Sequence, residues 1–252
     1  MLTASNAETD FLDALNAART RDDLFAALGA ELRRFGIGGY GYGFTPMRSS
    51  RGPMSDLGEL HFHHTYPQAW QDAIGDDTRQ DNDPSTILLF QGVEQVDWTT
   101  LGLAARKLGP DVLQHYEMAQ DLGFRCGVSL RLGADHTGRI LSGIGLWYPD
   151  HAQATVFRAD LARDRDRIGR ILQLFDIAVR GDHAALMIGL SVRERDALSY
   201  LAAGYRSAEA SWKMKISEKT LEKHVANAKH KLNARTRDHA VAKALLMGLI
   251  AP

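Results

Sequence analysis

The chain has 252 residues, of which 44% are hydrophobic and 24% charged, and its formal net charge is −1. This composition is typical of a soluble globular protein, and no apolar run reaches the roughly 20 residues that span a bilayer. The N-terminus lacks the basic start and apolar core of a secretory signal, and the single cysteine, Cys126, excludes an internal disulfide framework. We therefore expect a cytoplasmic protein.

The N-terminal part of the chain predicts two helices followed by strands. Apolar residues recur every three or four positions in residues 11–18 and 24–35, which is the helical period. The pattern changes to alternation at residues 36–44 and again at 60–66, as in strands. Further along, we expect helices around 67–74, 84–91 and 99–122, strands at 126–133 and 138–148, and a long helix over 153–180.

Strands that come in adjacent pairs between helices favour an antiparallel sheet covered by helices over a parallel doubly wound sheet. The expected fold class is α+β. We expect an N-terminal α/β/α sandwich similar to GAF and PAS domains over residues 1–179, a linker at 180–189 and an all-α domain of four helices at 190–252.

Charge is divided unevenly between these parts. From Met187 to Pro252 there are 12 Lys and Arg against 6 Asp and Glu, a net charge of +6, which leaves −7 for the remainder. A small basic module without a strong apolar face is more typical of nucleic-acid binding than of membrane binding.

The last 62 residues carry clear helix signals. Ser191 and Glu194 have the spacing of a capping box, Ser207 opens a second short helix, and Ser217 caps a third that runs to Leu232. A fourth helix follows up to Gly248. Four short helices with tight turns predict a helix-turn-helix module.

The third of these helices has two contrasting faces. At 100° per residue, Leu221, Val225, Ala228 and Leu232 form an apolar stripe. Lysines on the opposite face can neutralise phosphates, and Asn and Glu can read base edges. The residues expected to contact DNA are Ser217, Lys219, Thr220, Glu222, Lys223, Ala226, Asn227, His230 and Lys231. Taken alone, the same pattern also fits a solvated surface helix.

Residues 190–250 resemble the LuxR-type helix-turn-helix across its whole length. The matching positions are Glu194, Leu198, Gly204, Ser217, Thr220, His224, Asn227, Lys231, Leu232 and Arg237. The departures from the family pattern lie in and after the second helix, at Ala210, Ser211, Trp212, Lys213 and Lys215. The resemblance implies a DNA-binding module.

A second resemblance lies in the N-terminal part. Tyr66 is followed by Trp70 four residues later, Asp83 thirteen residues after that, and Trp98 fifteen residues further on. With Gly127 of a later strand, this spacing is similar to the autoinducer-binding domain of quorum-sensing LuxR-type regulators. The implied ligand is an N-acyl-homoserine lactone or a similar signal, and no cofactor is implied.

The chemistry of these side chains suits such a ligand. The resemblance implies that Trp70 donates to the lactone carbonyl and Tyr66 to the acyl carbonyl, while Asp83 accepts from the amide N–H and Trp98 packs on the lactone ring. Ser129 and Ser142, on the expected late strands, are candidates for further hydroxyl contacts. Taken singly, the aromatic residues are more typical of an ordinary core and Asp83 of a helix N-cap, and only the four together at the family spacing favour ligand binding.

Three positions depart from the pocket pattern of the family. Ile74, which we include among the expected ligand-binding residues, stands where an aromatic residue is common. Arg79 and Asn82 stand where an aromatic and an aliphatic residue are common. An altered pocket is compatible with a different acyl chain, a different signal or no ligand.

Two other motifs carry weaker signals. Residues 36–41 satisfy G-x-G-x-x-G, but a helix precedes and a strand follows, the reverse of a dinucleotide-binding turn. Of His61, His63 and His64, the first and second share one face of a strand, and the sequence places no third ligand beside them. We therefore expect exposed strand histidines and no metal site.

Together these patterns predict a ligand-responsive transcription factor of quorum sensing. We expect a homodimer on a two-fold symmetric DNA site, with RNA polymerase as an implied partner and no membrane association. The alternatives are a regulator that senses another signal or none, and an antagonist that forms mixed dimers with another regulator. An enzyme acting on acyl lactones would need a nucleophile, a base or a metal site, and the sequence offers no catalytic residues.

Overall fold

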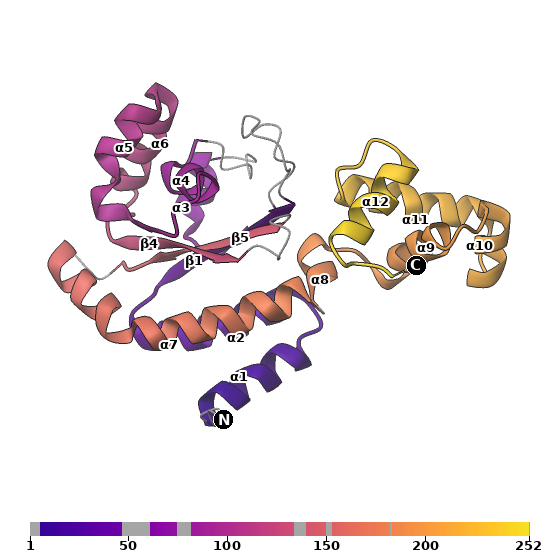
Figure 1. Ribbon diagram of the computed structural model, residues 1–252, viewed down its shortest axis with the longest axis horizontal. Helices are drawn as coiled ribbons and strands as arrows, with labels where there is room; N and C mark the ends of the chain where they lie inside the picture. Colours follow the sequence, from indigo (N-terminus) through magenta and orange to yellow (C-terminus); the bar gives the residue numbers. More distant parts are fainter. Residues whose placement is uncertain are drawn as a thin grey trace. The chain divides into compact units, whose positions relative to one another are not determined.

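Figure 1 shows the computed structural model, which describes residues 6–46, 61–74, 82–133, 140–149, 153–181 and 183–251. The chain divides into two compact units, one of residues 1–18 and 22–176 and the other of residues 19–21 and 177–252. We call the first unit the sensor domain and the second the C-terminal module. None of the described helices is long and apolar enough to cross a membrane.

The sensor domain is built on one antiparallel sheet of five strands in the order β2-β1-β5-β4-β3. The strands are β1 (Gly39–Pro46), β2 (His61–His64), β3 (Gln95–Asp97), β4 (Gly127–Gly133) and β5 (Ile140–Trp147). The antiparallel sheet was expected from the sequence. The edge strand β3 was not, because three residues are too few to show an alternating pattern.

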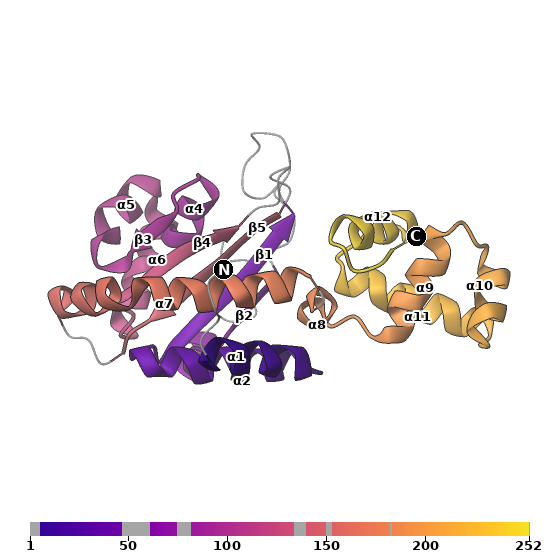
Figure 2. The same ribbon diagram turned by 60° about the horizontal axis from the view of Figure 1, so that its bottom comes forward.

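Helices cover both faces of this sheet. Helices α2 and α7 lie along one face, and α3 to α6 lie over the other (Figures 1 and 2). The bounds are α1 (Asn6–Ala17), α2 (Arg21–Leu32), α3 (Gln68–Ile74), α4 (Pro84–Phe90), α5 (Leu101–Leu108), α6 (Pro110–Asp121) and α7 (Ala154–Arg180), with 3-10 turns at Arg33–Phe35 and Trp98–Thr100. The expected α/β/α sandwich is confirmed.

Strand β1 shows why its sequence alternates between aromatic residues and glycine. Tyr40 donates a hydrogen bond to the carbonyl of Phe25 on α2, and Tyr42 donates to Asp176 on α7 with an O···O distance of 2.8 Å. Side chains alternate across a strand, so the intervening glycines face the α3–α6 side. The glycine-rich segment therefore belongs to a strand with two different faces, and it forms no dinucleotide-binding turn.

The glycines of neighbouring strands lie opposite one another. In the pairing of β1 with β5, Gly41 faces Gly145 and Gly43 faces Gly143, and Ser129 of β4 pairs with Gly145 on the other side. Small residues in register across three strands lower the surface of the sheet at this point. This patch, which we call the glycine floor, leaves space beneath α4.

The histidines of β2 are half-buried, so the expectation of exposed histidines was wrong. His61 packs on Phe44 with ring centroids 5.3 Å apart, and His63 meets Phe25 edge-on at 4.1 Å. Phe44 lies on the neighbouring strand β1 and Phe25 on α2, so His61 and His63 face the side of the sheet that α2 covers. Among the described residues, no three His, Cys, Asp or Glu side chains form a group able to hold a metal ion.

The C-terminal module consists of short helices. They are α8 (Ala184–Ile188), α9 (Val192–Ala202), α10 (Ser207–Met214), α11 (Glu218–Lys231) and α12 (Arg237–Leu246). Four of them are the helices expected from the sequence. The segment expected to be a plain linker instead contains α8, whose apolar residues Ala184, Ala185, Met187 and Ile188 are buried.

Helix ends in the module follow the capping signals of the sequence. Ser191 accepts from the backbone N–H of Glu194 at 3.2 Å, and the Glu194 carboxylate accepts from the backbone N–H of Ser191 at 2.8 Å. Ser217 caps α11 in the same way, accepting from the backbone N–H of Thr220. Lys215 ends α10 in the left-handed region, with φ 56°, which makes the tight turn into α11.

Candidate functional site

A cavity lies between the glycine floor and helices α3, α4 and α6 of the sensor domain. Its volume of about 100 Å³ is several times the roughly 10–15 Å³ that one water needs. The aromatic residues that line it are Phe62, Tyr66, Trp70, Phe90, Trp98, Tyr116 and Phe124, and the polar residues are Asp83, Ser85, Thr86, His115, Gln120 and Ser129. An apolar cavity with a few converging polar groups is the usual form of a small-molecule site.

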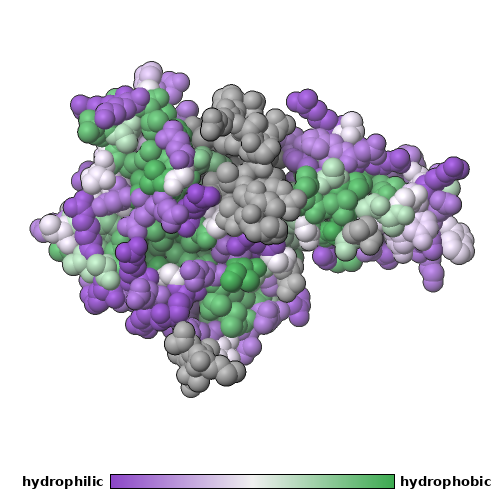
Figure 3. Space-filling model, in the orientation of Figure 1, coloured by the Kyte–Doolittle hydropathy of each residue, from purple (hydrophilic) through white to green (hydrophobic). Residues whose placement is uncertain are grey.

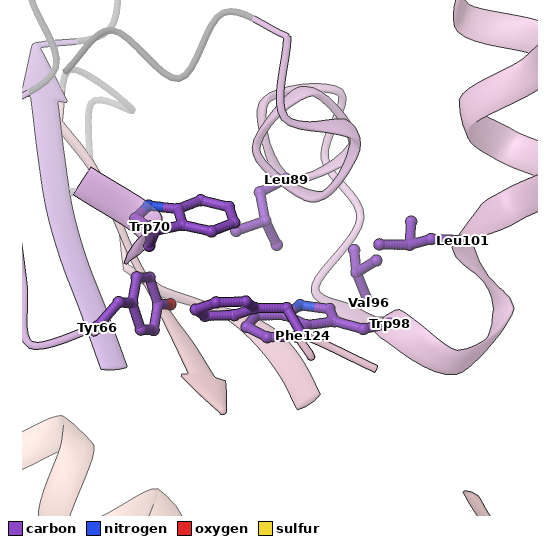
Figure 4. Packing of buried hydrophobic residues seen from close by; sticks show 7 residues of the cluster. All are labelled: Tyr66, Trp70, Leu89, Val96, Trp98, Leu101 and Phe124. Carbon is purple, nitrogen blue, oxygen red and sulfur yellow. The ribbon is translucent and has the colours of Figure 1, made fainter. Parts of the chain in front are cut away.

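The aromatic wall is a packed cluster of rings. Trp70 and Phe124 lie with ring centroids 4.5 Å apart, Tyr66 and Phe124 5.0 Å apart, and Tyr66 and Trp70 5.6 Å apart. Figure 4 shows these rings gathered with that of Trp98, with Leu89 of α4 next to them. The rings come from three separate segments of the chain, so the sheet and helices together fix the shape of the cavity.

Two of the buried aromatic residues differ in their hydrogen bonding. The Tyr66 hydroxyl donates to the carbonyl of Gly145 at 3.1 Å. Burial raises the pKa of this hydroxyl far above its ordinary value, and the nearby Asp83 carboxylate raises it further, so Tyr66 stays a donor at neutral pH. The indole N–H of Trp70 is also buried, but it has no hydrogen-bond partner among the described residues.

Asp83 is the N-cap of α4. Its carboxylate accepts from the backbone N–H groups of Ser85 and Thr86 at 3.0 and 3.2 Å, and from both their hydroxyls at 2.7 to 2.9 Å. The N-cap alternative is therefore correct for Asp83, which also lines the cavity. A carboxylate has about four lone-pair sites, so a ligand N–H would have to displace one of the two hydroxyls.

Trp98 is held in place by residues from three elements. Its indole N–H donates to the Ser129 hydroxyl of β4 at 2.8 Å. The preceding Asp97 caps the 3-10 turn and forms an ion pair with Arg158 of α7, whose Nε lies 2.7 Å from the carboxylate. Beneath the ring lies Gly127, where a Cβ would come within 2.1 Å of the indole. Trp98 can therefore occupy this position only because residue 127 has no side chain.

We expect Gly127→Ala to destabilise the sensor domain by about 1–3 kcal/mol, the usual cost of overpacking, because Trp98 must leave its place above β4. The indole would also lose its bond to Ser129. Thermal unfolding and tryptophan fluorescence of the variant measure both effects. Gly169→Ala is the matched control, since a Cβ there meets nothing within 4 Å. Equal stability of the two variants would contradict the packing argument.

The second candidate site is the outer face of α11 in the C-terminal module. Leu221, Val225, Ala228 and Leu232 are buried, as the apolar stripe predicted. On the opposite side, Ser217, Lys219, Glu222, Lys223, Ala226, Asn227 and His230 are exposed and Thr220 is half-buried. Hydrophilic residues line the upper and outer edges of the module in Figure 3. An exposed helix face of this composition suits a nucleic-acid groove.

Lys231 is half-buried, and its ammonium group is bound within the module. Its ammonium group donates to both carboxylate oxygens of Glu194, at 2.8 and 3.1 Å, and to the carbonyl of Gly189 at 2.7 Å. An ammonium group has three donors, and all three are used within the module. The structure thus gives Lys231 a role within the module, and the expectation that it contacts DNA stays a prediction.

Two family models match the chain, one over each of the regions that contain these sites. The family model described as "Autoinducer binding domain" matches residues 20–165, and the model described as "Bacterial regulatory proteins, luxR family" matches residues 189–244. The chain belongs to the LuxR family of quorum-sensing regulators. The cavity thus lies in the autoinducer-binding domain of a LuxR-family regulator, and α11 in its DNA-binding domain.

The LuxR-family regulator is similar to curated proteins over nearly its full length. It is 28% identical over 232 residues to the HTH-type quorum-sensing regulator RhlR of Pseudomonas aeruginosa, which covers 90% of this chain and 89% of the relative. It is 27% identical over 259 residues to the transcriptional activator protein SolR of Ralstonia solanacearum, covering 96% and 100%.

Among solved structures, Escherichia coli SdiA has the same fold, with a TM-score of 0.51 and 18% identity over 97% of this chain and 98% of that one. The structure of SdiA in complex with octanoyl-rac-glycerol has a TM-score of 0.50 and 19% identity, over 100% and 99% of the two chains.

The structure places most, but not all, of the expected ligand-binding residues around the cavity. Those that line it are Tyr66, Trp70, Asp83, Trp98 and Ser129. Ile74 packs against the aromatic cluster without lining the cavity, because it lies one helical turn beyond Trp70 on α3. Ser142 donates to the carbonyl of Gly133 and does not line the cavity. Asn82 is exposed, and Arg79 lies outside the described residues.

Sequence reasoning missed the part of the cavity wall that α6 supplies. His115, Tyr116, Ala119 and Gln120 lie on one side of that helix and line the cavity. Residues three to five positions apart are expected on one face of a helix, but this spacing does not show what that face packs against. Only the fold brings this face opposite Trp70.

Proposed function

We propose that this regulator binds an N-acyl-homoserine lactone in the cavity of the sensor domain and acts in the cytoplasm as a homodimer on a two-fold symmetric DNA site. The observation that carries the ligand proposal is the buried indole N–H of Trp70, which lacks a partner among the described residues. Leaving such a donor unpaired costs about 1–3 kcal/mol, which a ligand carbonyl would recover.

The remaining polar groups suit the rest of such a ligand. Tyr66 can turn its hydroxyl from the Gly145 carbonyl, 3.1 Å away, to an acyl carbonyl. Asp83 can accept the amide N–H in exchange for a hydroxyl of Ser85 or Thr86. The apolar surfaces of Leu89 and Leu101 offer contacts for an acyl chain.

Thermal unfolding of the full-length protein against a panel of N-acyl-homoserine lactones of varied chain length tests this proposal. A ligand at 100 times its dissociation constant adds about 2.7 kcal/mol of stability, which corresponds to a shift of several degrees. Octanoyl glycerol belongs in the panel as an acylated ligand without an amide, because SdiA forms a complex with it.

Selective stabilisation by one chain length supports the lactone proposal. Stabilisation by octanoyl glycerol alone would indicate that the natural ligand is an acylated compound other than a lactone. No shift with any compound, in protein shown to be free of co-purified ligand, would favour a regulator that works without a small molecule.

We propose that two C-terminal modules of a dimer place their α11 helices in successive major grooves, and that the bound dimer contacts RNA polymerase. The exposed side chains of Lys219, Lys223 and His230 would face phosphates, and those of Glu222 and Asn227 the base edges. This arrangement rests on the exposed polar face of α11 and on the basic charge of the module.

We expect Lys223→Ala to weaken binding to a cognate operator and to lower the slope of the salt dependence of binding by about one unit, because one phosphate is no longer neutralised. Electrophoretic mobility shift or fluorescence anisotropy at several salt concentrations measures both quantities. Lys107→Ala is the control, since it removes the same charge from an exposed position on α5. If Lys223→Ala leaves the affinity and the salt slope unchanged, DNA binds to another surface of the module.

We also propose that the regulator releases its signal chemically unchanged. The Asp83 carboxylate lines the cavity, but it accepts hydrogen bonds as the N-cap of α4. It therefore does not activate a nucleophile there. Incubation of the protein with the stabilising lactone, followed by mass spectrometry, is expected to return intact lactone. Turnover above the rate in buffer would indicate an enzyme.

A further inference from the structure

Helix α6 contributes a histidine to the cavity that the proposed contacts leave unused. His115 lines the cavity, and its Nε2 atom is buried without a hydrogen-bond partner among the described residues. Its imidazole meets the indole of Trp70 edge-on, with ring centroids 5.7 Å apart and an interplanar angle of 84°. The two rings that carry these unpartnered nitrogens are therefore in contact with each other in the cavity wall.

Four other polar side chains around the cavity have hydrogen-bond partners. Gln120 donates to the carbonyl of Phe124 at 3.0 Å, and Ser129 accepts from Trp98 at 2.8 Å. Tyr66 bonds to Gly145 and Asp83 caps α4. Because a buried polar atom without a partner costs free energy, the pair of Trp70 and His115 marks the place where a ligand gains most by offering acceptors.

An acyl-homoserine lactone makes three strong hydrogen bonds in the proposed mode, and they use Tyr66, Asp83 and Trp70. In this mode His115 has no hydrogen-bond partner unless the head group offers a second oxygen beside the carbonyl that Trp70 binds. A neutral imidazole with its proton on Nε2 is a donor like the indole N–H, so the two rings together match two adjacent oxygen acceptors.

We propose that His115 is a specificity-determining residue that pairs with Trp70 to bind two adjacent oxygens on the head group of an acylated ligand. This inference rests on the proposed ligand-binding function of the same cavity. Two head groups have this chemistry: the carbonyl and ring oxygen of a lactone, and the carboxylate of the corresponding ring-opened acyl amino acid. A carboxylate would make the stronger hydrogen bonds to the pair, whereas the lactone avoids the desolvation of a charge and its repulsion by Asp83 in the same cavity.

The test uses three probes that share the acyl chain giving the largest shift in the lactone panel. They are the acyl-homoserine lactone, the ring-opened acyl-homoserine, and the acyl cyclopentylamide, which lacks both head-group oxygens. Dissociation constants are measured by isothermal titration calorimetry on full-length wild type and on His115→Phe, which keeps a ring of similar size without nitrogen. Gln114→Ala is the matched control, since its side chain is exposed on the same helix.

We expect His115→Phe to weaken binding of the better oxygen-bearing probe about tenfold, the effect of one missing hydrogen bond, and to change binding of the cyclopentylamide less than about twofold. His115→Gln, whose amide can donate from nearly the same place, should restore part of the loss. Whichever oxygen-bearing probe binds wild type more tightly identifies the head group as a lactone or a carboxylate.

An equal loss for all three probes would show that His115 only fills space, and no loss for any probe would show that it does not contact the ligand; either result overturns the proposal while the lactone-binding function stands. Failure of all three probes to bind wild type overturns both. A loss in Gln114→Ala equal to that in His115→Phe would also contradict a specific role for the histidine.

Discussion

Replacing Asp83 by alanine is expected to weaken binding of the stabilising lactone by about 10- to 100-fold, because the charged acceptor for the ligand amide is removed. The same change removes the N-cap of α4 and its bonds to the backbone of Ser85 and Thr86, which costs about 0.5–2 kcal/mol of stability. Isothermal titration and thermal unfolding of the full-length protein measure the two effects separately.

Two further variants separate the cap from the ligand contact. A serine in Asp83→Ser still caps α4 but does not present a carboxylate to the ligand, so stability should stay near wild type while affinity falls. The amide oxygen in Asp83→Asn accepts a neutral hydrogen bond and should give an intermediate affinity. If all three variants bind the lactone as wild type does, Asp83 is a helix cap and nothing more.

Replacing Glu194 by alanine is expected to have the largest effect on the C-terminal module. The Glu194 side chain is 4% exposed, and it pairs with Lys231 and with the backbone of Ser191 at the start of α9. Breaking a buried pair usually costs about 3–5 kcal/mol, and we expect about 3 kcal/mol, because the Lys231 side chain is 35% exposed and regains water.

The unfolding transition of the module in the full-length protein should move down by more than about 10 °C, given a shift of roughly 4–8 °C per kcal/mol for a unit of this size. Glu222→Ala, on the exposed face of α11, is the control and should leave the transition in place. Joint replacement of Glu194 and Lys231 by methionine should recover part of the loss, since no unpaired charge remains buried. A transition unmoved in Glu194→Ala would show that the pair does not stabilise the fold.

The same pair sets a pH dependence. Burial by itself would raise the pKa of the Glu194 carboxyl, but hydrogen bonds from Lys231 and Ser191 outweigh it and hold the pKa below its ordinary value of 4.5. A lowered pKa in the folded state means that the pair contributes its full stability above about pH 4.5 and loses it as the pH falls through the lowered value. The stability difference between wild type and Glu194→Ala should therefore shrink only below that pH.

The helices of the C-terminal module were predictable because their signals are local. Capping by Ser191 and Ser217 depends on residues within one helical turn, and the stripe from Leu221 to Leu232 follows the helical period. The alternation of glycine and aromatic residues in β1 likewise marked a strand with two different faces. Each of these patterns involves only a few neighbouring residues, so it can be recognised from the sequence alone.

The sequence could not assign Lys231 or His115 to their partners. Lys231 reaches Glu194, 37 positions earlier, and this pairing appears only when α9 and α11 pack together. On a helical wheel, Lys231 looks like any other lysine next to the exposed face. His115 meets Trp70 because the sheet brings α3 and α6 to the same side, and no spacing between the two residues encodes that meeting.

By itself, the sequence determined the two-part organisation, the helix-turn-helix module, the antiparallel sheet and the family resemblance of Tyr66, Trp70, Asp83 and Trp98. Only the tertiary structure decided that the glycine floor opens a cavity, that Asp83 caps α4 while it lines that cavity, and that two ring nitrogens there have no partner among the described residues. The physical reason is that capping and periodicity are properties of neighbouring residues. A cavity and its unpaired donors arise from distant segments that are placed together by the packing of the whole domain.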